Sequence, residues 1–436
     1  MLNLQRYQRR LEESDPVCVN GRVVDVVGLT VEATGPPMRI GDLCYVQTRT
    51  GGNKVPVEVM GFRGRRILLM PLGDMHGIAP DSLLIPTYKP QMVPVGDELL
   101  GRVIDSMGMP LDGGPVPKSA DKVPLLAVPP RPLERTRIEA PVATGIRAID
   151  ACITCGKGQR MGVISGSGVG KSKMIGMIAR NTNADVNVIG LIGERGREVR
   201  EFVEGDLGPE GLGRSVVVVA TSDEPALRRV KGAYMATAIA EWFRDRGADV
   251  MLMLDSITRF AMAQREVGLA IGEPPTTKGY PPSVYSLLPK LLERAGTSPQ
   301  GSITGIYAVL VEADDLNDPI GDAVRSILDG HIALSRDLAT RNHYPAVDVT
   351  DSISRCMIDV TSEEHQRLAG DLRGILATYR DAEDLVNIGA YVEGSNPEID
   401  RALRLMPKIR AFLQQGLYEE SPFEEIERLL RDVLQG

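Results

Sequence analysis

The sequence predicts an α/β protein in three parts: a small N-terminal β-barrel, a central domain with a mainly parallel sheet, and a C-terminal helical domain. Three observations support this prediction. Short β-like runs and turns fill the first part, strands and helices alternate in the middle, and the strands stop near residue 361. The chain of 436 residues is also too long for one compact core.

The N-terminal region begins with a predicted amphipathic segment over residues 1–17, in which Leu4, Tyr7 and Leu11 share one helical face. Residues 18–90 then carry short runs such as GRVVDVV, LTVEAT and VPVEVM, separated by glycine-containing turns. Strands that recur at such short spacing are typical of a small barrel.

Residues 91–360 are predicted to form the central domain. They include a proline-crowded stretch over 110–137, which favours an extended connection. Apolar runs such as RMGVIS, VNVIGLIG, SVVVVATS and DVMLMLD then alternate with helical segments. Such runs are typical of parallel strands buried on both faces. The last part, residues 361–436, has helical periodicity and forms the predicted C-terminal domain.

Composition narrows the possible partners. The net charge of −8 and the isoelectric point near 5.3 offer no general basic surface for nucleic acid or anionic lipid. We find no secretory leader and no apolar run long enough for a membrane span, so we expect a cytoplasmic protein. The five cysteines favour reduced thiols, and CITC at 152–155 lacks the partners of a zinc site.

A glycine-rich loop, ISGSGVGKSK at 164–173, resembles the phosphate-binding pattern G-x-x-x-x-G-K-[ST], with Ser165 in place of the first glycine. The loop follows an apolar strand and opens a helix, where backbone N–H groups can hold phosphates. A glycine turn without a ligand is the alternative. The predicted nucleotide-binding residues of this loop are Gly166, Ser167, Gly168, Val169, Gly170, Lys171, Ser172 and Lys173.

Within this loop Lys171 is expected to neutralise the β- and γ-phosphates, and the Ser172 hydroxyl is expected to bind Mg²⁺. Asp255 ends the run VMLML and would support the same metal, although an aspartate there could also cap the next helix. Glu194 follows the strand VNVIGLIG and is the predicted general base. Glu198 is its rival, but we expect it to be solvated or paired with an arginine.

Several motifs, in this order, resemble the catalytic subunits of rotary ATPases: SGSGVGKS, GERGREVREF, VMLMLDSITRFA, LVEADDLNDPIGD, HYPAVDV and DSISR. The chain resembles most closely the ATPases of flagellar and type III protein export, with NIGAYVEGSNPEID typical of the flagellar branch. The resemblance runs from about residue 21 to the C-terminus. It implies a RecA-like P-loop NTPase fold for the central domain, hydrolysis of Mg-ATP and a homohexameric ring.

The resemblance also assigns roles to single residues. Arg195 and Arg259 match arginines that lie close to the phosphates, although either could be a surface cation. Tyr344 matches the aromatic residue that stacks on adenine, with an ordinary core tyrosine as the alternative, and Phe423 is placed on the other side of the base. Arg355 matches the arginine finger that reaches the nucleotide of the neighbouring subunit.

Lys173 departs from the family, which usually has a threonine whose hydroxyl reaches the α-phosphate. A lysine could contact that phosphate itself. The resulting hypothesis is an altered nucleotide affinity rather than an inactive site.

The resemblance implies several partners. The segment 1–17 would dock a stator-like regulatory protein, and the loop 314–318 would face a central stalk protein. Export gate and substrate–chaperone complexes are further expected partners, with the protein held peripherally at the inner-membrane export apparatus. No nucleic-acid partner is expected.

Three alternative functions stay open at this stage. The first is an ATP-synthase-type or vacuolar-type subunit coupled to proton flow. The second is an RNA-translocating hexameric ATPase, for which the predicted barrel offers few stacking aromatics. The third is a nucleotide-binding structural subunit without turnover, against which Glu194 argues.

Overall fold

The computed structural model describes residues 19–48, 52–117, 121–166, 168–311 and 318–435. The predicted segment 1–17 and most of the loop 314–318 therefore lie outside the described residues. The chain divides into two compact units, one made of residues up to Gln91 together with Leu269–Glu273, and the other of the remaining chain.

The first unit is a closed antiparallel barrel, as predicted. Its strands follow the order β1-β2-β5-β4-β3-β6 around the barrel. Alternate residues point inward, so that Val23, Cys44 and Val57 are buried in one apolar cluster. The strands are β1 (Gly21–Val27), β2 (Thr30–Thr34), β3 (Asp42–Gln47), β4 (Lys54–Arg63), β5 (Arg66–Pro71) and β6 (Leu83–Pro90).

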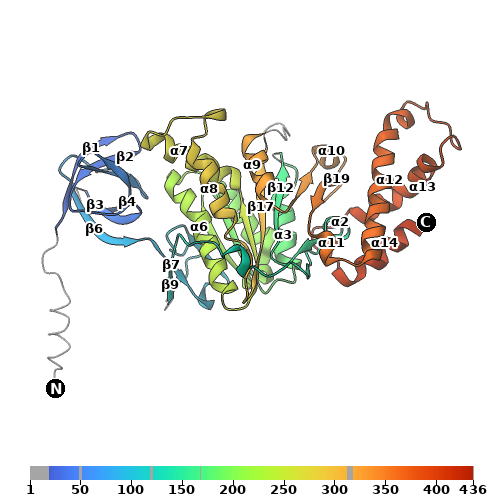
Figure 1. Ribbon diagram of the computed structural model, residues 1–436, viewed down its shortest axis with the longest axis horizontal. Coiled ribbons are helices and arrows are strands. Elements are labelled where there is room, and N and C mark those ends of the chain that lie inside the picture. Colours follow the sequence, from blue (N-terminus) through green and yellow to red (C-terminus); the bar gives the residue numbers. More distant parts are fainter. Residues whose placement is uncertain (1–18, 49–51, 118–120, 167, 312–317, 436) are drawn as a thin grey trace, which may run out of the picture. The chain divides into compact units, whose positions relative to one another are not determined.

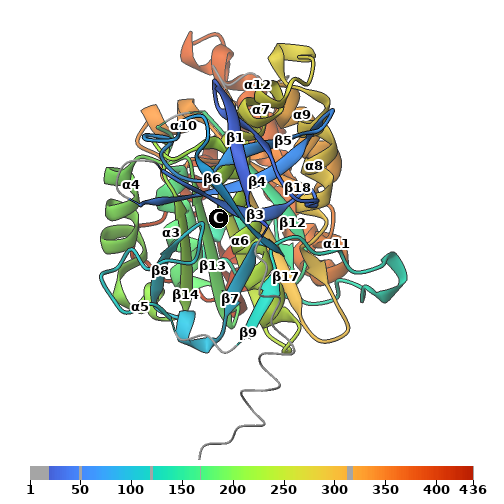
Figure 2. The same cartoon turned by 90° about the vertical axis from the view of Figure 1, so that its left-hand side faces the viewer.

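The second unit is built on a mainly parallel sheet with the order β19-β18-β12-β17-β15-β13-β14-β8. All neighbours along this order are parallel except β18 and β19, which pair antiparallel at one edge. Central strands such as β13 and β14, which lie side by side in Figure 2, are buried along their whole length, which explains their continuous apolar runs. The strands are β8 (Arg102–Asp105), β12 (Arg160–Ser165), β13 (Val186–Ile192), β14 (Ser215–Ala220), β15 (Asp249–Asp255), β17 (Ser302–Leu310), β18 (Gly330–Leu334) and β19 (Val347–Ser354).

Helices pack on this sheet: α6 contacts β13, β14 and β15, α3 contacts β15, and α9 contacts β12 and β17 (Figure 1). The helices before the tail are α2 (Arg147–Cys152), α3 (Lys171–Asn181), α4 (Gly196–Glu201), α5 (Gly208–Gly213), α6 (Ala226–Arg244), α7 (Ile257–Ile271), α8 (Pro282–Leu292), α9 (Pro319–Ile327), α10 (Arg336–Thr340) and α11 (Met357–Val360). A π-helical turn, Phe202–Leu207, joins α4 to α5.

The proline-crowded stretch contains one short strand, which pairs with the strand that leaves the barrel unit. Elsewhere the second unit has two further short strands that pair with each other and one that pairs with β17. These short strands are β7 (Met92–Val95), β9 (Asp121–Pro124), β10 (Pro141–Val142), β11 (Cys155–Gly156) and β16 (Gly296–Thr297).

The C-terminal region is helical, as predicted, with α12 (Glu363–Asn387), α13 (Pro397–Leu413) and α14 (Ile426–Gln435). These helices pack on one another, and all three contact α2 (Figure 1). Their apolar side chains continue the core of the central sheet, since Leu372, Leu405 and Leu430 belong to the same buried cluster as Val163 of β12. The tail therefore belongs to the same compact unit as the sheet.

Two sequence-based expectations about membranes and thiols can be compared with the described residues. No helix among them is both long and apolar enough to cross a membrane. The four cysteines that the structure describes carry free thiols, and the pair Cys152 and Cys155 is buried.

Candidate active site

The glycine loop connects β12 to α3 at the carboxyl edge of the parallel sheet. Gly168 and Gly170 have φ values of 81° and 94°, which a residue with a Cβ rarely adopts. Gly170 precedes the first turn of α3, so that the helix N-terminus opens toward the loop. Ser167 lies outside the described residues.

Three predicted site residues meet at this edge. Lys171 opens α3, Asp255 ends β15 and Glu194 follows β13, a direct neighbour of β15. The Lys171 ammonium forms an ion pair with the Asp255 carboxylate, and its Nζ lies 3.8 Å from Oε1 of Glu194. Lys171 is 9% exposed and Asp255 is 2% exposed, so these charges interact in a largely water-excluded place.

The environment of Glu194 fits a proton acceptor. Burial raises the pKa of its carboxyl to about 7, with a further contribution from the negative charge of Asp255 and an opposing one from Lys171. Glu198 differs, because hydrogen bonding with Glu194 and then with Arg195 lowers its pKa. Its Oε1 accepts a hydrogen bond of 2.8 Å from Arg195, which confirms the expected arginine pairing of Glu198.

This pKa gives a prediction for the pH dependence of turnover. A base must be deprotonated to accept a proton, so kcat/KM for ATP is expected to rise with pH through an apparent pKa of about 7. Below that value the rate should fall about tenfold per pH unit. Steady-state hydrolysis at saturating magnesium measures this pH dependence of kcat/KM. The affinity for ADP over the same pH range is the control for nucleotide binding. A flat profile between about pH 6 and pH 8 would contradict the assignment of Glu194.

The two arginines predicted near the phosphates differ in their surroundings. The Arg195 side chain is 74% exposed and paired with Glu198. The Arg259 stem packs over Gly193, the residue before Glu194, where an added Cβ would lie 2.8 Å from Cβ of Arg259. Within the described chain the Arg259 side chain makes no ion pair, and its Nε is buried without a hydrogen-bond partner. The stem of Arg259 thus lies against the residue that precedes Glu194.

Arg355 follows β19, the antiparallel strand at the edge of the sheet, and its side chain is exposed. Its backbone N–H donates to the carbonyl of Asp329 at 3.0 Å. The guanidinium contacts no carboxylate among the residues that the structure describes. Arg355 is not among the residues that line the pocket beside the glycine loop of its own chain.

A pocket of about 390 Å³ adjoins the glycine loop and is mostly apolar. Tyr344 lines it with 42% exposure, so the alternative of a core tyrosine is wrong. Its ring lies 3.4 Å from the place where a Cβ on Gly170 would stand. The lining residues are Gly168, Val169, Gly170, Lys173, Met174, Met177, Leu334, Tyr344, Pro345, Ala346, Gln415 and Leu417.

The prediction for Phe423 requires correction, because this residue does not line the pocket. Its ring packs instead near His365 of α12, with 6.4 Å between ring centroids. The tail reaches the pocket through Gln415 and Leu417, which sequence reasoning missed. The Gln415 backbone N–H donates to the Tyr344 carbonyl at 2.9 Å. These two residues lie in a loop without periodicity, so no sequence signal marked them.

Lys173 also has a partner that the sequence did not reveal. Its Nζ lies 2.6 Å from Oδ1 of Asp206, whose side chain is only 5% exposed. Asp206 belongs to the π-helical turn and packs on α3 at Gly176, where a Cβ would meet the Asp206 backbone oxygen at 2.9 Å. The ion pair therefore joins the helix of the glycine loop to the segment that follows α4.

This ion pair leads to a second prediction. Lys173→Thr is expected to lower the free energy of unfolding by about 1–3 kcal/mol, because it leaves the buried Asp206 carboxylate without its cation. Denaturant unfolding measures this loss of stability. The double variant Lys173→Thr with Asp206→Asn should regain most of the lost free energy of unfolding, because no buried carboxylate is left unpaired. The KM of the double variant then compares Lys173 with the threonine that is usual in the family. An unchanged KM and kcat in that variant would contradict the altered nucleotide affinity expected for Lys173.

Comparison with known proteins gives three family matches along the chain. The β-barrel domain of the ATP synthase alpha/beta family matches residues 23–87, the nucleotide-binding domain of the same family matches 145–354, and the T3SS EscN ATPase C-terminal domain matches 361–432. Together they cover the barrel, the sheet with its glycine loop, and the helical tail.

Individual proteins match over nearly the whole chain. The flagellum-specific ATP synthase of Bacillus subtilis is 53% identical over 95% of each chain, and the type 3 secretion system ATPase of Xanthomonas euvesicatoria is 50% identical over 95% of this chain and 93% of its own. The assembled ATPase EscN of the enteropathogenic E. coli type III secretion system superimposes with a TM-score of 0.90, at 46% identity, over 95% of this chain and 100% of that one.

The fold and the site thus define a nucleotide-binding ATPase, and the chain belongs to the ATP synthase alpha/beta family. Within that family it is a member of the flagellar and type III secretion ATPases. The sequence-based prediction of family, fold class and ATP-hydrolysing activity is confirmed.

Proposed function

We propose that this chain hydrolyses Mg-ATP as the motor of the flagellar type III export apparatus and energises the export of flagellar proteins across the inner membrane. The observation that carries the proposal is the meeting of Lys171, Glu194 and Asp255 beside the glycine loop. The likeness to flagellum-specific relatives supports the export role.

The residues present fit a magnesium ion bound together with nucleotide. Ser172 is exposed at the start of α3, and the Asp255 carboxylate lies at the end of β15 in contact with Lys171. A hydroxyl, a carboxylate and phosphate oxygens form the hard oxygen set that Mg²⁺ prefers. When bound, Mg²⁺ would neutralise charge on the β- and γ-phosphate oxygens. Ser172 and Asp255 would hold it.

The protein groups perform the remaining chemistry. Backbone N–H groups of residues 166–172 orient the phosphates, and Lys171 adds its charge. Glu194 orients a water molecule and accepts its proton while the water oxygen bonds to the γ-phosphorus and the bond to ADP breaks. Arg195 and Arg259 of the same subunit stabilise the developing negative charge, together with Arg355 of a neighbouring copy. Tyr344 stacks on the base.

The proposed assembly is a homohexameric ring, in which Arg355 would reach the nucleotide pocket of the neighbouring subunit, and the likeness to the assembled ATPase EscN supports it. The loop 314–318 would face a central stalk protein, as EscN does in a solved complex with its central stalk EscO, which matches this chain with a TM-score of 0.88 at 45% identity. The segment 1–17 would dock a stator-like protein at the inner-membrane export apparatus. Export gate and substrate–chaperone complexes complete the proposed partners.

Secretion in the host organism tests the export role. Deletion of the gene is expected to stop the secretion of flagellar subunits, and the wild-type gene but not Glu194→Gln is expected to restore it. Hydrolysis by the purified protein should proceed without RNA. Undiminished flagellar secretion in the deletion strain would contradict the export role, and hydrolysis that requires single-stranded RNA would favour a translocating ring.

A further inference from the structure

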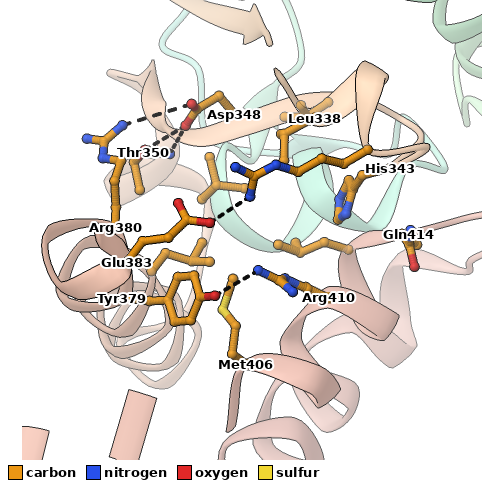
Figure 3. A pocket seen from close by; sticks show the side chains of 15 residues that line it. Leu338, His343, Asp348, Thr350, Tyr379, Arg380, Glu383, Met406, Arg410 and Gln414 are labelled. Atoms are coloured by element: carbon orange, nitrogen blue, oxygen red, sulfur yellow. Dashed lines mark hydrogen bonds and ion pairs between the residues drawn. The ribbon is translucent and has the colours of Figure 1, made fainter. Parts of the chain in front are cut away.

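A second pocket, of about 230 Å³, lies between the elements α10 and β19 and the tail helices α12 and α13 (Figure 3). No residue of the glycine loop lines it, so this pocket is separate from the nucleotide pocket. Much of its wall is apolar, with contributions from both sides. The apolar lining residues are Leu338, Val347, Val349, Leu376, Met406 and Leu413.

The charged lining of this pocket consists of three arginines and the carboxylates of Asp348 and Glu383, with Asp348 lying 4.0 Å from Arg380. Arg341 is paired with Glu383 at 2.7 Å, and Arg380 is paired with Asp351 at 3.1 Å. Arg410 contacts no carboxylate among the described residues. It donates one hydrogen bond of 3.1 Å to the Tyr379 hydroxyl, and its guanidinium carbon lies 5.2 Å from that ring's centroid (Figure 3). A guanidinium has five N–H donors, so most of those of Arg410 stay available.

His343 supplies a second unused polar group. It lines the pocket, is only 7% exposed, and its ring makes no hydrogen bond within the described part of the chain. Burial, and then the charge of Arg410, lowers the pKa of His343. The ring is therefore neutral at neutral pH, and it offers one donor and one acceptor to a ligand in the pocket that it lines.

We propose that this pocket binds a small organic anion, with a carboxylate on Arg410 and His343 and an apolar body against Leu338, Leu376 and Met406. A guanidinium matches the planar geometry of a carboxylate, and Arg410 is exposed, so a ligand can reach it from solvent. The volume is below the roughly 300–1,000 Å³ of pockets for drug-sized ligands, so the ligand is of fragment size.

Because of the position of the pocket, we expect the ligand to change the affinity for nucleotide. This conclusion rests on the proposed nucleotide site. The two pockets have no lining residue in common, but their walls are adjacent in sequence: His343 is followed by Tyr344, and Gln414 is followed by Gln415. The Gln415 backbone also donates to the Tyr344 carbonyl at 2.9 Å. A ligand held by His343 and Arg410 therefore orders the segments that form the nucleotide pocket, and changes nucleotide affinity.

Binding of 3-phenylpropionate, a fragment with one carboxylate, tests the site. The full chain is first saturated with Mg-ADP, which occupies the glycine loop, and titrated by ligand-observed NMR and calorimetry. We expect one binding site with a Kd of about 1 mM. The neutral analogue 3-phenylpropionamide should bind at least tenfold more weakly. Equal binding of acid and amide, or no binding at about 10 mM, would overturn the proposal.

Variants locate the binding. Arg410→Gln is expected to weaken 3-phenylpropionate binding at least tenfold, Arg410→Lys less, and the exposed control Arg428→Gln not at all. Thermal unfolding checks that each variant is folded. A folded Arg410→Gln protein with unchanged affinity would refute the assignment. If Arg410→Gln does not fold, His343→Phe takes its place, with the same outcome required.

The regulatory part has its own measurement, the affinity for ADP with and without saturating 3-phenylpropionate. A change of about fivefold or more is expected in the wild type and not in Arg410→Gln. An unchanged ADP affinity would overturn the regulatory role. If the wild-type protein binds 3-phenylpropionate but does not hydrolyse ATP, the proposed catalytic function fails while the anion site stands. The two failures can therefore be told apart.

Discussion

Glu194→Gln is expected to slow ATP hydrolysis by about 10²–10⁴-fold, the usual contribution of a general base, while Mg-ATP still binds. The amide keeps the size of the side chain but accepts no proton from the attacking water. Lys171 and Asp255, which hold the phosphates and the metal in the proposed mechanism, are unchanged. Phosphate release measures turnover, and equilibrium binding of a fluorescent ATP analogue measures affinity.

Glu198→Gln is the matched control for this substitution. Glu198 lies one turn further on and pairs with Arg195, so its loss is expected to change the rate by less than about tenfold. If both variants lose the same factor in hydrolysis rate, Glu194 is not distinguished from Glu198 as the general base. An unchanged rate in Glu194→Gln would support a nucleotide site without a base at this position.

Arg355→Ala is expected to reduce hydrolysis by about 10³–10⁵-fold, the range measured for arginine fingers. The loss should be seen in assembled protein, because the proposed finger acts on the neighbouring subunit. Within its own subunit the exposed guanidinium contacts no carboxylate among the described residues, so its removal should leave thermal stability unchanged. Arg428→Ala, at another exposed arginine, serves as the control.

A mixing experiment separates action on a neighbour from action within one subunit. Arg355→Ala subunits keep the base and Glu194→Gln subunits keep the finger. In randomly mixed rings made from equal amounts, about a quarter of the interfaces combine an intact base with an intact finger. We expect turnover to recover toward that fraction of the wild-type rate. Verified mixed rings without recovery would show that Arg355 does not act across an interface.

Much of the candidate site could be predicted because its parts are local in sequence. The glycine loop is contiguous with its strand and helix. Glu194 and Asp255 each follow an apolar run, and the carboxyl ends of parallel strands lie at the same edge of a sheet. The order of the strands could not be predicted in this way. Strand β12 pairs with β17 and β18, far along the chain, and side-chain packing decides such pairings.

The contacts that could not be predicted from the sequence involve segments without helix or strand periodicity. Asp206 lies in a π-helical turn, so its approach to Lys173 depends on how that turn packs against α3. Gln415 lies in a loop of the tail and lines the nucleotide pocket, where its backbone N–H donates to the Tyr344 carbonyl. Phe423 was placed wrongly for the same reason, because an aromatic residue in an irregular loop has no face fixed by periodicity.

The edge strand β19 links two positions that act on different nucleotides in the proposed ring. Tyr344 lies three residues before its start and Arg355 directly after its end. The strand has eight residues, and its pairing with β18 is interrupted by a register shift between its two ends. It therefore connects the base pocket to the finger by one short stretch of backbone, which a β-bulge allows to bend. Nucleotide binding in one subunit of the proposed ring would then influence the position of the finger that completes the next site.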